Sequence, residues 1–352
     1  MKTGNKNFLQ HIFSYFPGGR LPVFLTLTVL LLLATGCEKA DVYTMNPKAN
    51  FDALWRIIDE HYCFFEYKNV DWNEVYRKYD SQLSDTLNKY ELFDLLGNML
   101  AELKDGHTNL MSSFDVARYW AWYENYPRNF NEDIHKLYLG QNYRIAGGIK
   151  YQLLADDKIG YMFYESFSSS VSDSGLNEVF MHFKDCKGLI IDVRENGGGS
   201  LGYSDRIASR FLDRDTVVGY IIHKTGPGHN DFSKLYPIEL TPSKYTRWLR
   251  PVVVLTNRHS YSATNDFVNK MRNFPQVTIM GDRTGGGGGL PFNSELPNGW
   301  RVRFSASPLL DIDKQCAEDG IEPDVKVALQ SADVDKGKDT LIESAIAFLL
   351  KD

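Results

Sequence analysis

Two short polar stretches hold the residues that could carry out chemistry in this chain of 352 residues. In the later stretch, the apolar run 252–256 has the β-branched composition of a buried strand, and Ser262 follows it just before a helical pattern begins. A helix N-terminus offers free N–H groups and a positive dipole end, so a hydroxyl there can act as a nucleophile when a base takes its proton. The same position favours serine as an N-cap, so Ser262 alone predicts a capping residue.

The second polar stretch supplies a candidate base. Histidine accepts protons near neutral pH, and of the eight histidines His107 is the one that follows a turn signal, Asp105-Gly106, beyond the end of a helical pattern. A base in contact with a hydroxyl contributes roughly 10²- to 10⁴-fold in rate. Without a partner, a histidine at such a turn is better explained by a structural role.

Two glycine runs also follow strand patterns. Gly197 to Gly199 come after an apolar strand, and glycine lets a reacting carbonyl approach closely while exposing backbone N–H groups. Such donors can form an oxyanion hole, although a tight turn explains the run equally well. The second run, 285–289, is not followed by the lysine of a phosphate-binding P-loop. No H-E-x-x-H or G-x-S-x-G motif occurs.

The elements that must position these residues form two regions. Residues from about 50 to 104 have three successive helical patterns, the second of them with Asp71 as a predicted N-cap, and predict a small bundle without chemistry. Residues 111–145 are rich in aromatic side chains and are interpreted as a lid or one wall of a cleft. From Gly148 onward strand and helix patterns alternate, which predicts an α/β fold with a largely parallel sheet. The loops at the carboxyl ends of its strands are expected to converge.

The N-terminus has the pattern of an export signal. Three basic residues and no acidic residue lie in the first 36 positions, and the apolar run 21–34 is short for a membrane-spanning helix. The small residues before Cys37 resemble a bacterial lipobox, which implies cleavage before Cys37 and lipidation of its thiol. An ordinary secretory signal or a short membrane anchor is the alternative.

Charge and cysteine content exclude other classes. The net charge is −6, and removal of the three basic residues of the leader would make it −9, which argues against nucleic acid as a partner. The remaining cysteines, Cys63, Cys186 and Cys316, are odd in number and include no C-x-x-C pair. They predict neither a disulfide framework nor a zinc site.

Five blocks of sequence, taken together and in order, are similar to those of the S41 serine peptidases. That family includes the C-terminal processing, tail-specific, tricorn-core and retinoid-binding-protein-like branches, and the resemblance covers about residues 50–330. It implies a crotonase/ClpP-like core of stacked β–β–α units, with an N-terminal helical bundle and serine peptidase chemistry that uses no metal or other cofactor. The blocks are "LKDGHTNL", "GLIIDVRENGGGS", "VVVLTNRHSYSATNDF", "GDRTGGGG" and "GIEPDV".

The resemblance also implies roles for particular residues. Ser262 matches the family nucleophile, and the backbone N–H groups of Gly198 and Ala263 match the oxyanion donors. Gly287 stands where the processing branch has a catalytic lysine, which disfavours a Ser–Lys pair. His107 fits the histidine base of the tricorn-like branch, with Glu318 as the candidate orienting carboxylate.

The match to the tricorn-like branch is incomplete. The residue before His107 is Gly106 where that branch has an orienting serine, so the group that orients the histidine stays open. The family often inserts a PDZ domain before the core, but only about 40 residues separate His107 from Gly148 here, too few for such a domain.

These observations predict a serine peptidase that acts on a peptide or protein by a Ser–His mechanism, anchored to the bacterial cell envelope through lipid on Cys37, at the periplasmic or outer-membrane face. A catalytically inactive peptide-binding protein on the same fold and a hydrolase of non-peptide esters or lipids are the alternatives, and the oligomeric state is open. The predicted parts are a lipoprotein signal peptide at 1–36, a tether at 37–50, a helical domain at 51–110, an aromatic-rich connector at 111–147 and an S41 peptidase-like core at 148–352.

Overall fold

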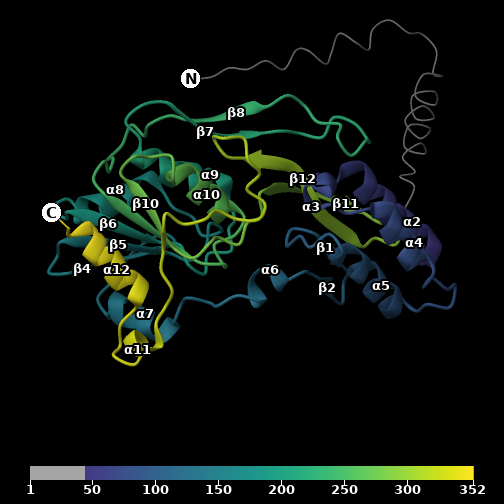
Figure 1. Cartoon of the computed structure of the whole chain (residues 1–352), viewed down its shortest axis with the longest axis horizontal. Helices are drawn as coiled ribbons and strands as arrows, with labels where there is room; N and C mark the ends of the chain where they lie inside the picture. The colour runs from purple at the N-terminus through teal and green to yellow at the C-terminus, as the bar shows by residue number, and fades with distance from the viewer. Residues whose placement is uncertain (1–43, 352) are drawn as a thin grey trace, which may run out of the picture. The chain divides into compact units, whose positions relative to one another are not determined.

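The computed structural model of the chain describes residues 44–351 (Figure 1). The predicted signal peptide and Cys37 lie outside the described residues. Within 44–351, no helix has both the length and the apolar character needed to cross a membrane.

The core of the fold is a seven-stranded mixed sheet. Five neighbouring strands run parallel, as the alternation of strand and helix patterns predicted, and an antiparallel pair completes one edge. In pairing order the strands are β13 (Val325–Lys326), β10 (Val277–Gly281), β9 (Val252–Thr256), β6 (Gly188–Asp192), β5 (Ile159–Tyr164), β4 (Ile149–Leu154) and β3 (Arg144–Ala146).

Helices cover both faces of this sheet, which explains why its central strands are continuously apolar. On β9, Val252 and Val254 pack with one set of helices, whereas Val253 and Leu255 face the other set because successive side chains of a strand alternate. The first set is α8 (Asp173–His182), α9 (Leu201–Ala208) and α10 (Ala263–Met271). The second set is α7 (Glu132–Leu139) and α12 (Thr340–Leu349), with the short α11 (Ser331–Val334) preceding α12 in the chain.

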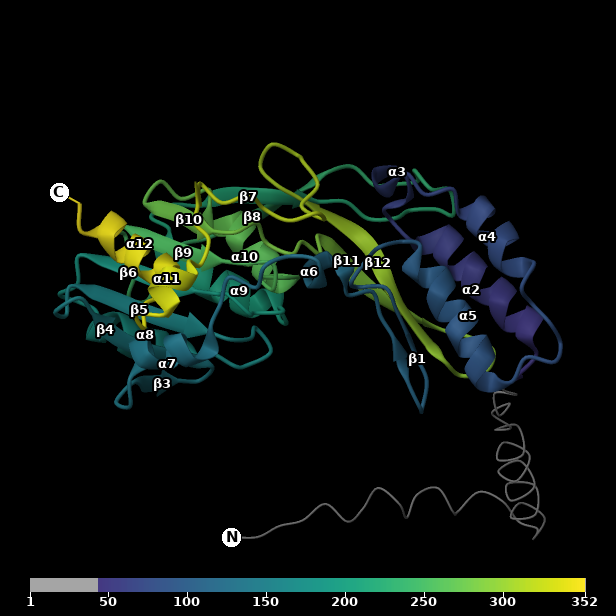
Figure 2. The ribbon, with the colours of Figure 1, turned by 60° about the horizontal axis from the view of Figure 1, so that its bottom comes forward.

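A second sheet of six strands was not predicted. Its centre is the long strand β12 (Arg301–Leu310), whose buried Val302 and Phe304 pack against the N-terminal helices, and Figure 2 shows this strand extending from the core to those helices. All of its pairings are antiparallel. The other strands are β1 (Asn109–Met111), β2 (Val116–Ala117), β7 (Thr216–Ile221), β8 (Tyr236–Leu240) and β11 (Gly289–Glu295).

The N-terminal helices form the predicted bundle. They are α2 (Pro47–His61), α3 (Phe65–Lys68), α4 (Trp72–Asp80) and α5 (Lys89–Ala101). The Asp71 side chain accepts the backbone N–H of Glu74 at 2.9 Å, so its prediction as the N-cap of α4 is confirmed. Because α2 begins at Pro47, the predicted tether is too long by four residues.

The aromatic-rich connector contains more regular structure than the sequence indicated. It includes β2, α7 and the one-turn helix α6 (Ala121–Glu124). N-terminal helices precede this connector in the chain, and the largely parallel sheet follows it. The chain therefore has the mixed α/β architecture that was predicted.

Candidate active site

Three loops converge at the carboxyl ends of β6, β9 and β10, which are neighbouring parallel strands. They are the first glycine run, the stretch that leads to Ser262 and the second glycine run. Tyr261 forms an isolated bridge with Gly286, and its N–H donates to the carbonyl oxygen of Asn196 at 3.1 Å. The predicted convergence of these loops is therefore confirmed.

Ser262 occupies the N-cap position of α10 but does not act as a cap. Its side chain makes no hydrogen bond to the first turn of the helix. Its backbone has φ 59° and ψ −120°, a conformation that costs a non-glycine residue energy and that clusters at functional sites. The contact from Ser262 N–H to the Gly286 carbonyl, 2.9 Å, helps to hold this conformation. The capping interpretation of Ser262 is therefore wrong.

The Ser262 hydroxyl meets His107 instead. Its Oγ lies 2.8 Å from His107 Nε2, although the two residues are 155 positions apart. Burial lowers the pKa of His107 to about 4, and the positive charge of Arg303 acts in the same direction, whereas the charge of Asp105 opposes it. The imidazole is therefore neutral at pH 7 and its Nε2 can accept the serine proton when Nδ1 carries the ring proton.

Asp105 is the acidic residue that acts directly on His107, although its place before Gly106 predicted only a turn. The side chain of Asp105 is buried, and its Oδ1 accepts the backbone N–H of His107 at 2.7 Å. This contact fixes the turn that presents the histidine. Asp105 Oδ2 and His107 Nδ1 are both buried and have no hydrogen-bond partner among the described residues.

The two predicted oxyanion donors differ in availability. Gly198 lies next to the nucleophile, since a Cβ there would be 2.8 Å from Ser262 Cβ and 2.9 Å from the Ala263 nitrogen. However, the Gly198 N–H donates to Asn196 Oδ1 at 3.0 Å. The Ala263 N–H makes no hydrogen bond within residues 44–351. A role for Gly198 thus requires its N–H to be shared with Asn196, whereas Ala263 can donate without rearrangement.

Glu318 is buried beside the site but does not contact His107. Its Oε1 lies 2.8 Å from Lys68 Nζ and its Oε2 accepts the N–H of Gly288 at 2.9 Å. Burial and the nearby charge of Asp105 raise the pKa of Glu318 to about 8, against the opposing effect of Lys68. The structure therefore does not bring Glu318 into hydrogen-bond contact with His107, as an orienting carboxylate would require.

The Tyr261 side chain packs against Gly106 and Gly287, the two positions at which this chain departs from the family pattern. A Cβ on Gly106 would lie 2.7 Å from Tyr261 Oη, and a Cβ on Gly287 would lie 2.6 Å from Tyr261 Cζ. The tyrosine ring is 5.0 Å from the His107 ring and stacks on Trp122, with ring centroids 4.1 Å apart. A larger residue at position 106 or 287 would therefore collide with this ring.

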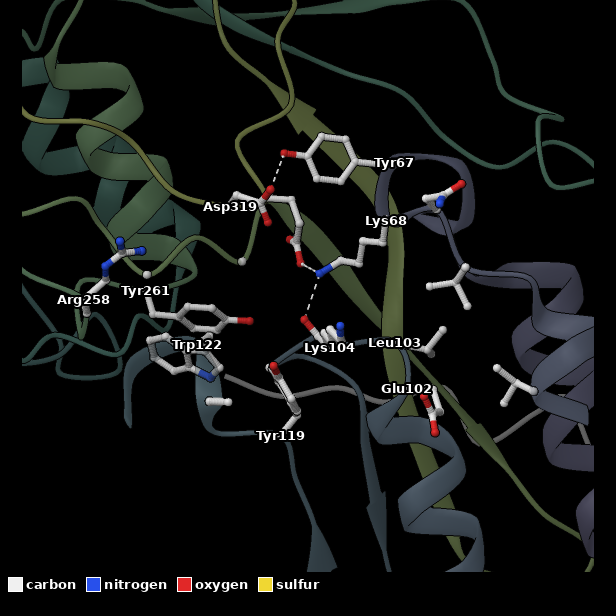
Figure 3. A pocket seen from close by; sticks show the side chains of 18 of the residues that line it. Tyr67, Lys68, Glu102, Leu103, Lys104, Tyr119, Trp122, Arg258, Tyr261 and Asp319 are labelled. Carbon is white, nitrogen blue, oxygen red and sulfur yellow. Dashed lines mark hydrogen bonds and ion pairs between the residues drawn. The ribbon is translucent and has the colours of Figure 1, made fainter. Parts of the chain in front are cut away.

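A cavity of about 970 Å³ adjoins the site between the helical bundle and the core (Figure 3). Tyr261 and Glu318 contribute to its wall, but Ser262 and His107 do not. Trp122 and other residues of the connector also line it, so this segment forms one wall of a cavity, in line with its interpretation.

Comparisons with known proteins agree with this architecture. Family models match at two places, Peptidase family S41 over residues 158–327 and the Tricorn protease C1 domain over residues 44–101. A solved structure of a putative peptidase from Parabacteroides merdae is 64% identical and has a TM-score of 0.85, with 88% of this chain and 98% of that chain covered. This chain belongs to peptidase family S41.

Two further relatives of this S41 protein have lower sequence identity. Carboxy-terminal processing protease CtpA of Bacillus subtilis is 24% identical over 181 residues, which are 51% of this chain and 37% of that protein. The tricorn protease is 18% identical with a TM-score of 0.55, covering 85% of this chain and 36% of that one, which shows a shared fold. The match spans only about a third of the length of the curated relatives, between 31% and 37% for the first two.

Proposed function

We propose that this S41 protein is a serine peptidase in which Ser262 attacks a peptide carbonyl and His107 is the general base. The observation that carries the proposal is the 2.8 Å contact between Ser262 Oγ and His107 Nε2. It joins a strained residue at a strand-to-helix junction with a buried, neutral imidazole, and S41 membership favours peptide hydrolysis over non-peptide substrates.

The proposed reaction has two stages. As the bond from Ser262 Oγ to the carbonyl carbon forms, His107 Nε2 takes the hydroxyl proton, and the N–H of Ala263 donates to the oxyanion, joined by that of Gly198 if Asn196 shares it. The imidazolium then protonates the leaving amine. Water, deprotonated by His107, hydrolyses the acyl-enzyme and releases the new carboxylate. Asp105 stabilises the transient positive charge on the buried ring.

A fluorophosphonate probe, which reacts with activated serines, tests this assignment. The probe is expected to label the wild-type protein on Ser262 and to leave Ser262→Ala unlabelled, while circular dichroism shows the same fold for both. Profiling with a peptide library and with acyl esters then identifies the substrate class. Absence of both labelling and peptide cleavage in the folded wild-type protein would favour the inactive peptide-binding alternative, and cleavage of esters alone would favour the non-peptide hydrolase.

We also propose that the substrate is a peptide or protein cleaved at the cell envelope, where lipid on Cys37 holds the enzyme. The curated relatives named as carboxyl-terminal processing proteases support the substrate class, and the apolar run before Cys37 supports the anchor. In a bacterial host the full chain should incorporate radiolabelled palmitate and sediment with membranes. Cys37→Ser should lose the label and leave the membrane fraction, and equal labelling of both chains would refute lipidation at Cys37.

A further inference from the structure

Lys68 is a buried lysine that the proposed chemistry does not use. It is the last residue of α3, and its side chain is only 12% exposed. Its Nζ lies 2.8 Å from Glu318 Oε1. It also donates to the carbonyl oxygen of Lys104 at 3.0 Å, a contact drawn in Figure 3. One ammonium group therefore joins the helical bundle, the turn before His107 and a loop of the core.

One of these contacts leads to the base. Lys104 lies three residues before His107 and has a φ of 48°, which is strained for a side-chain-bearing residue. Its carbonyl is held by Lys68, and the next residue, Asp105, accepts the His107 N–H. Without the hydrogen bond from Lys68 to the Lys104 carbonyl, the turn that positions the His107 imidazole would be less rigid.

The other contact leads to the nucleophile. Glu318 Oε2 accepts the N–H of Gly288, and the carbonyl oxygen of Glu318 accepts the N–H of Gly287 at 3.0 Å. A Cβ on Gly286 would overlap that same carbonyl, so the glycine run passes tightly against Glu318. The Gly286 carbonyl in turn accepts the N–H of Ser262. Lys68 is thus connected to both members of the Ser–His pair.

We propose that Lys68 is a positioning residue for the Ser262–His107 pair, which it aligns through the Lys104 carbonyl and the Glu318 carboxylate. The inference rests on the proposed peptidase function. A residue of the one-turn helix α3 would thus fix the position of the nucleophile relative to the base.

Electrostatics agree with this role. Both oxygens of Glu318 face donors, Lys68 Nζ and the Gly288 N–H, so the observed contacts are those of the ionised carboxylate. Burial lowers the pKa of Lys68, but the charges of Glu318 and Asp105 outweigh this effect and raise it. The charge of this carboxylate also acts on Tyr62, Cys63, Tyr67, Tyr261 and Cys316, and the charge of Asp319 acts on Lys68.

Substitution of Lys68 in the full chain tests the inference. Lys68→Met should raise the pKa of Glu318 above about 8, since an opposite charge typically shifts a carboxyl by about 1–3 pH units. The rate of fluorophosphonate labelling at pH 7.5 should fall on the order of tenfold or more, because fewer molecules hold the ionised carboxylate. The rise of that rate with pH, centred near 8 in the wild type, should move to higher pH.

Three comparison variants separate positioning from general damage. Lys68→Arg keeps the charge and should retain most of the labelling rate, whereas Lys68→Gln keeps a donor without charge and should behave like Lys68→Met. Lys48→Met is the matched control, because it removes a half-exposed lysine of the same bundle that pairs with Asp80 at 2.7 Å. Its labelling rate and pH profile should equal those of the wild type.

A second readout does not depend on catalysis. The positive charge of Lys68 lowers the pKa of His107, so NMR titration of the His107 ring should show a higher pKa in Lys68→Gln than in the wild type. If the wild-type protein is not labelled at all, the peptidase proposal fails, and the NMR comparison still decides the placement of His107. An unchanged His107 resonance and pKa in Lys68→Gln, or an unchanged labelling profile in folded Lys68→Met, would overturn the inference.

Discussion

Replacing His107 by glutamine is expected to lower kcat for peptide hydrolysis on the order of 10⁴- to 10⁶-fold, with the fold retained. Glutamine can fill the space and hydrogen-bond to Ser262 Oγ, now 2.8 Å from the imidazole, but it cannot accept the proton. A fluorogenic form of a cleaved peptide measures the loss. His61→Gln, which changes an exposed histidine of the bundle, should retain full activity.

The pH dependence of the wild-type enzyme provides an independent check on the same base. Because burial lowers the pKa of His107 to about 4, kcat/KM should show no fall near pH 6.5; it should fall near pH 8, where Glu318 gains its proton, and again near pH 4, where His107 gains one. An acid limb near pH 6.5 would show that the base is a solvated histidine.

The stability of the folded protein should also depend on the titration of His107, and it should decrease as the pH falls. The folded protein binds the His107 proton more weakly than the unfolded chain does, so His107 makes folding less favourable as pH falls from 6.5 towards 4. Labelling should therefore be timed in seconds at low pH, before unfolding contributes.

Retention of more than about one percent of kcat in His107→Gln would point to another base.

Much of the site was predictable because its chemistry is carried by loops that follow strong strand patterns. The continuous apolar run at 252–256 predicted a central strand, and parallel strands bring their carboxyl-end loops together. What the sequence could not decide was whether Ser262 caps α10 or faces a base. That distinction depends on the side-chain direction set by a φ of 59°, which has no sequence signature outside glycine.

Lys68 and Asp105 were not identified from the sequence because each lies in a pattern that usually has another explanation. Lys68 ends a one-turn helix of sequence Phe-Glu-Tyr-Lys, and a lysine side chain is typical of a solvated surface. Asp105 before glycine predicts a turn, and it does form one while also facing the histidine. Lys68 is buried against Glu318 of a core loop, a contact between residues far apart in the chain that no local pattern encodes. The strand β12, on which the bundle packs, was also missed although Asn298-Gly299 marks the hairpin turn before it.

Replacing Arg194 by methionine is expected to lower the free energy of unfolding by about 3–5 kcal/mol. The guanidinium is completely buried and bridges two carboxylates, with Nη2 2.7 Å from Asp192 Oδ2 and Nη1 2.9 Å from Asp339 Oδ2. Methionine fills similar space, but it leaves both carboxylates buried without a cation. Asp339 also accepts the N–H of Leu341 as the N-cap of α12, so the substitution should weaken the start of that helix as well. Denaturant unfolding at pH 7.5 measures the change.

A matched arginine nearby shows what an exposed ion pair contributes. Arg128 Nε donates to Glu195 Oε2 at 2.7 Å, but the arginine side chain is 56% exposed. Arg128→Met should therefore cost at most about 1 kcal/mol, because solvent screens such pairs. Equal losses in the two variants would mean that burial does not determine the effect.

The pH dependence of the Arg194→Met defect should distinguish charge from packing. In the wild type, burial raises the pKa of Asp192, but the charge of Arg194 outweighs it and holds that pKa below its ordinary value. Without the cation only the burial effect remains, so the folded variant favours a protonated Asp192. The stability gap between wild type and variant should therefore narrow as pH falls from 7.5 towards 5. Arg194→Lys should recover only part of the loss, because one ammonium cannot reproduce the forked contact with two carboxylates.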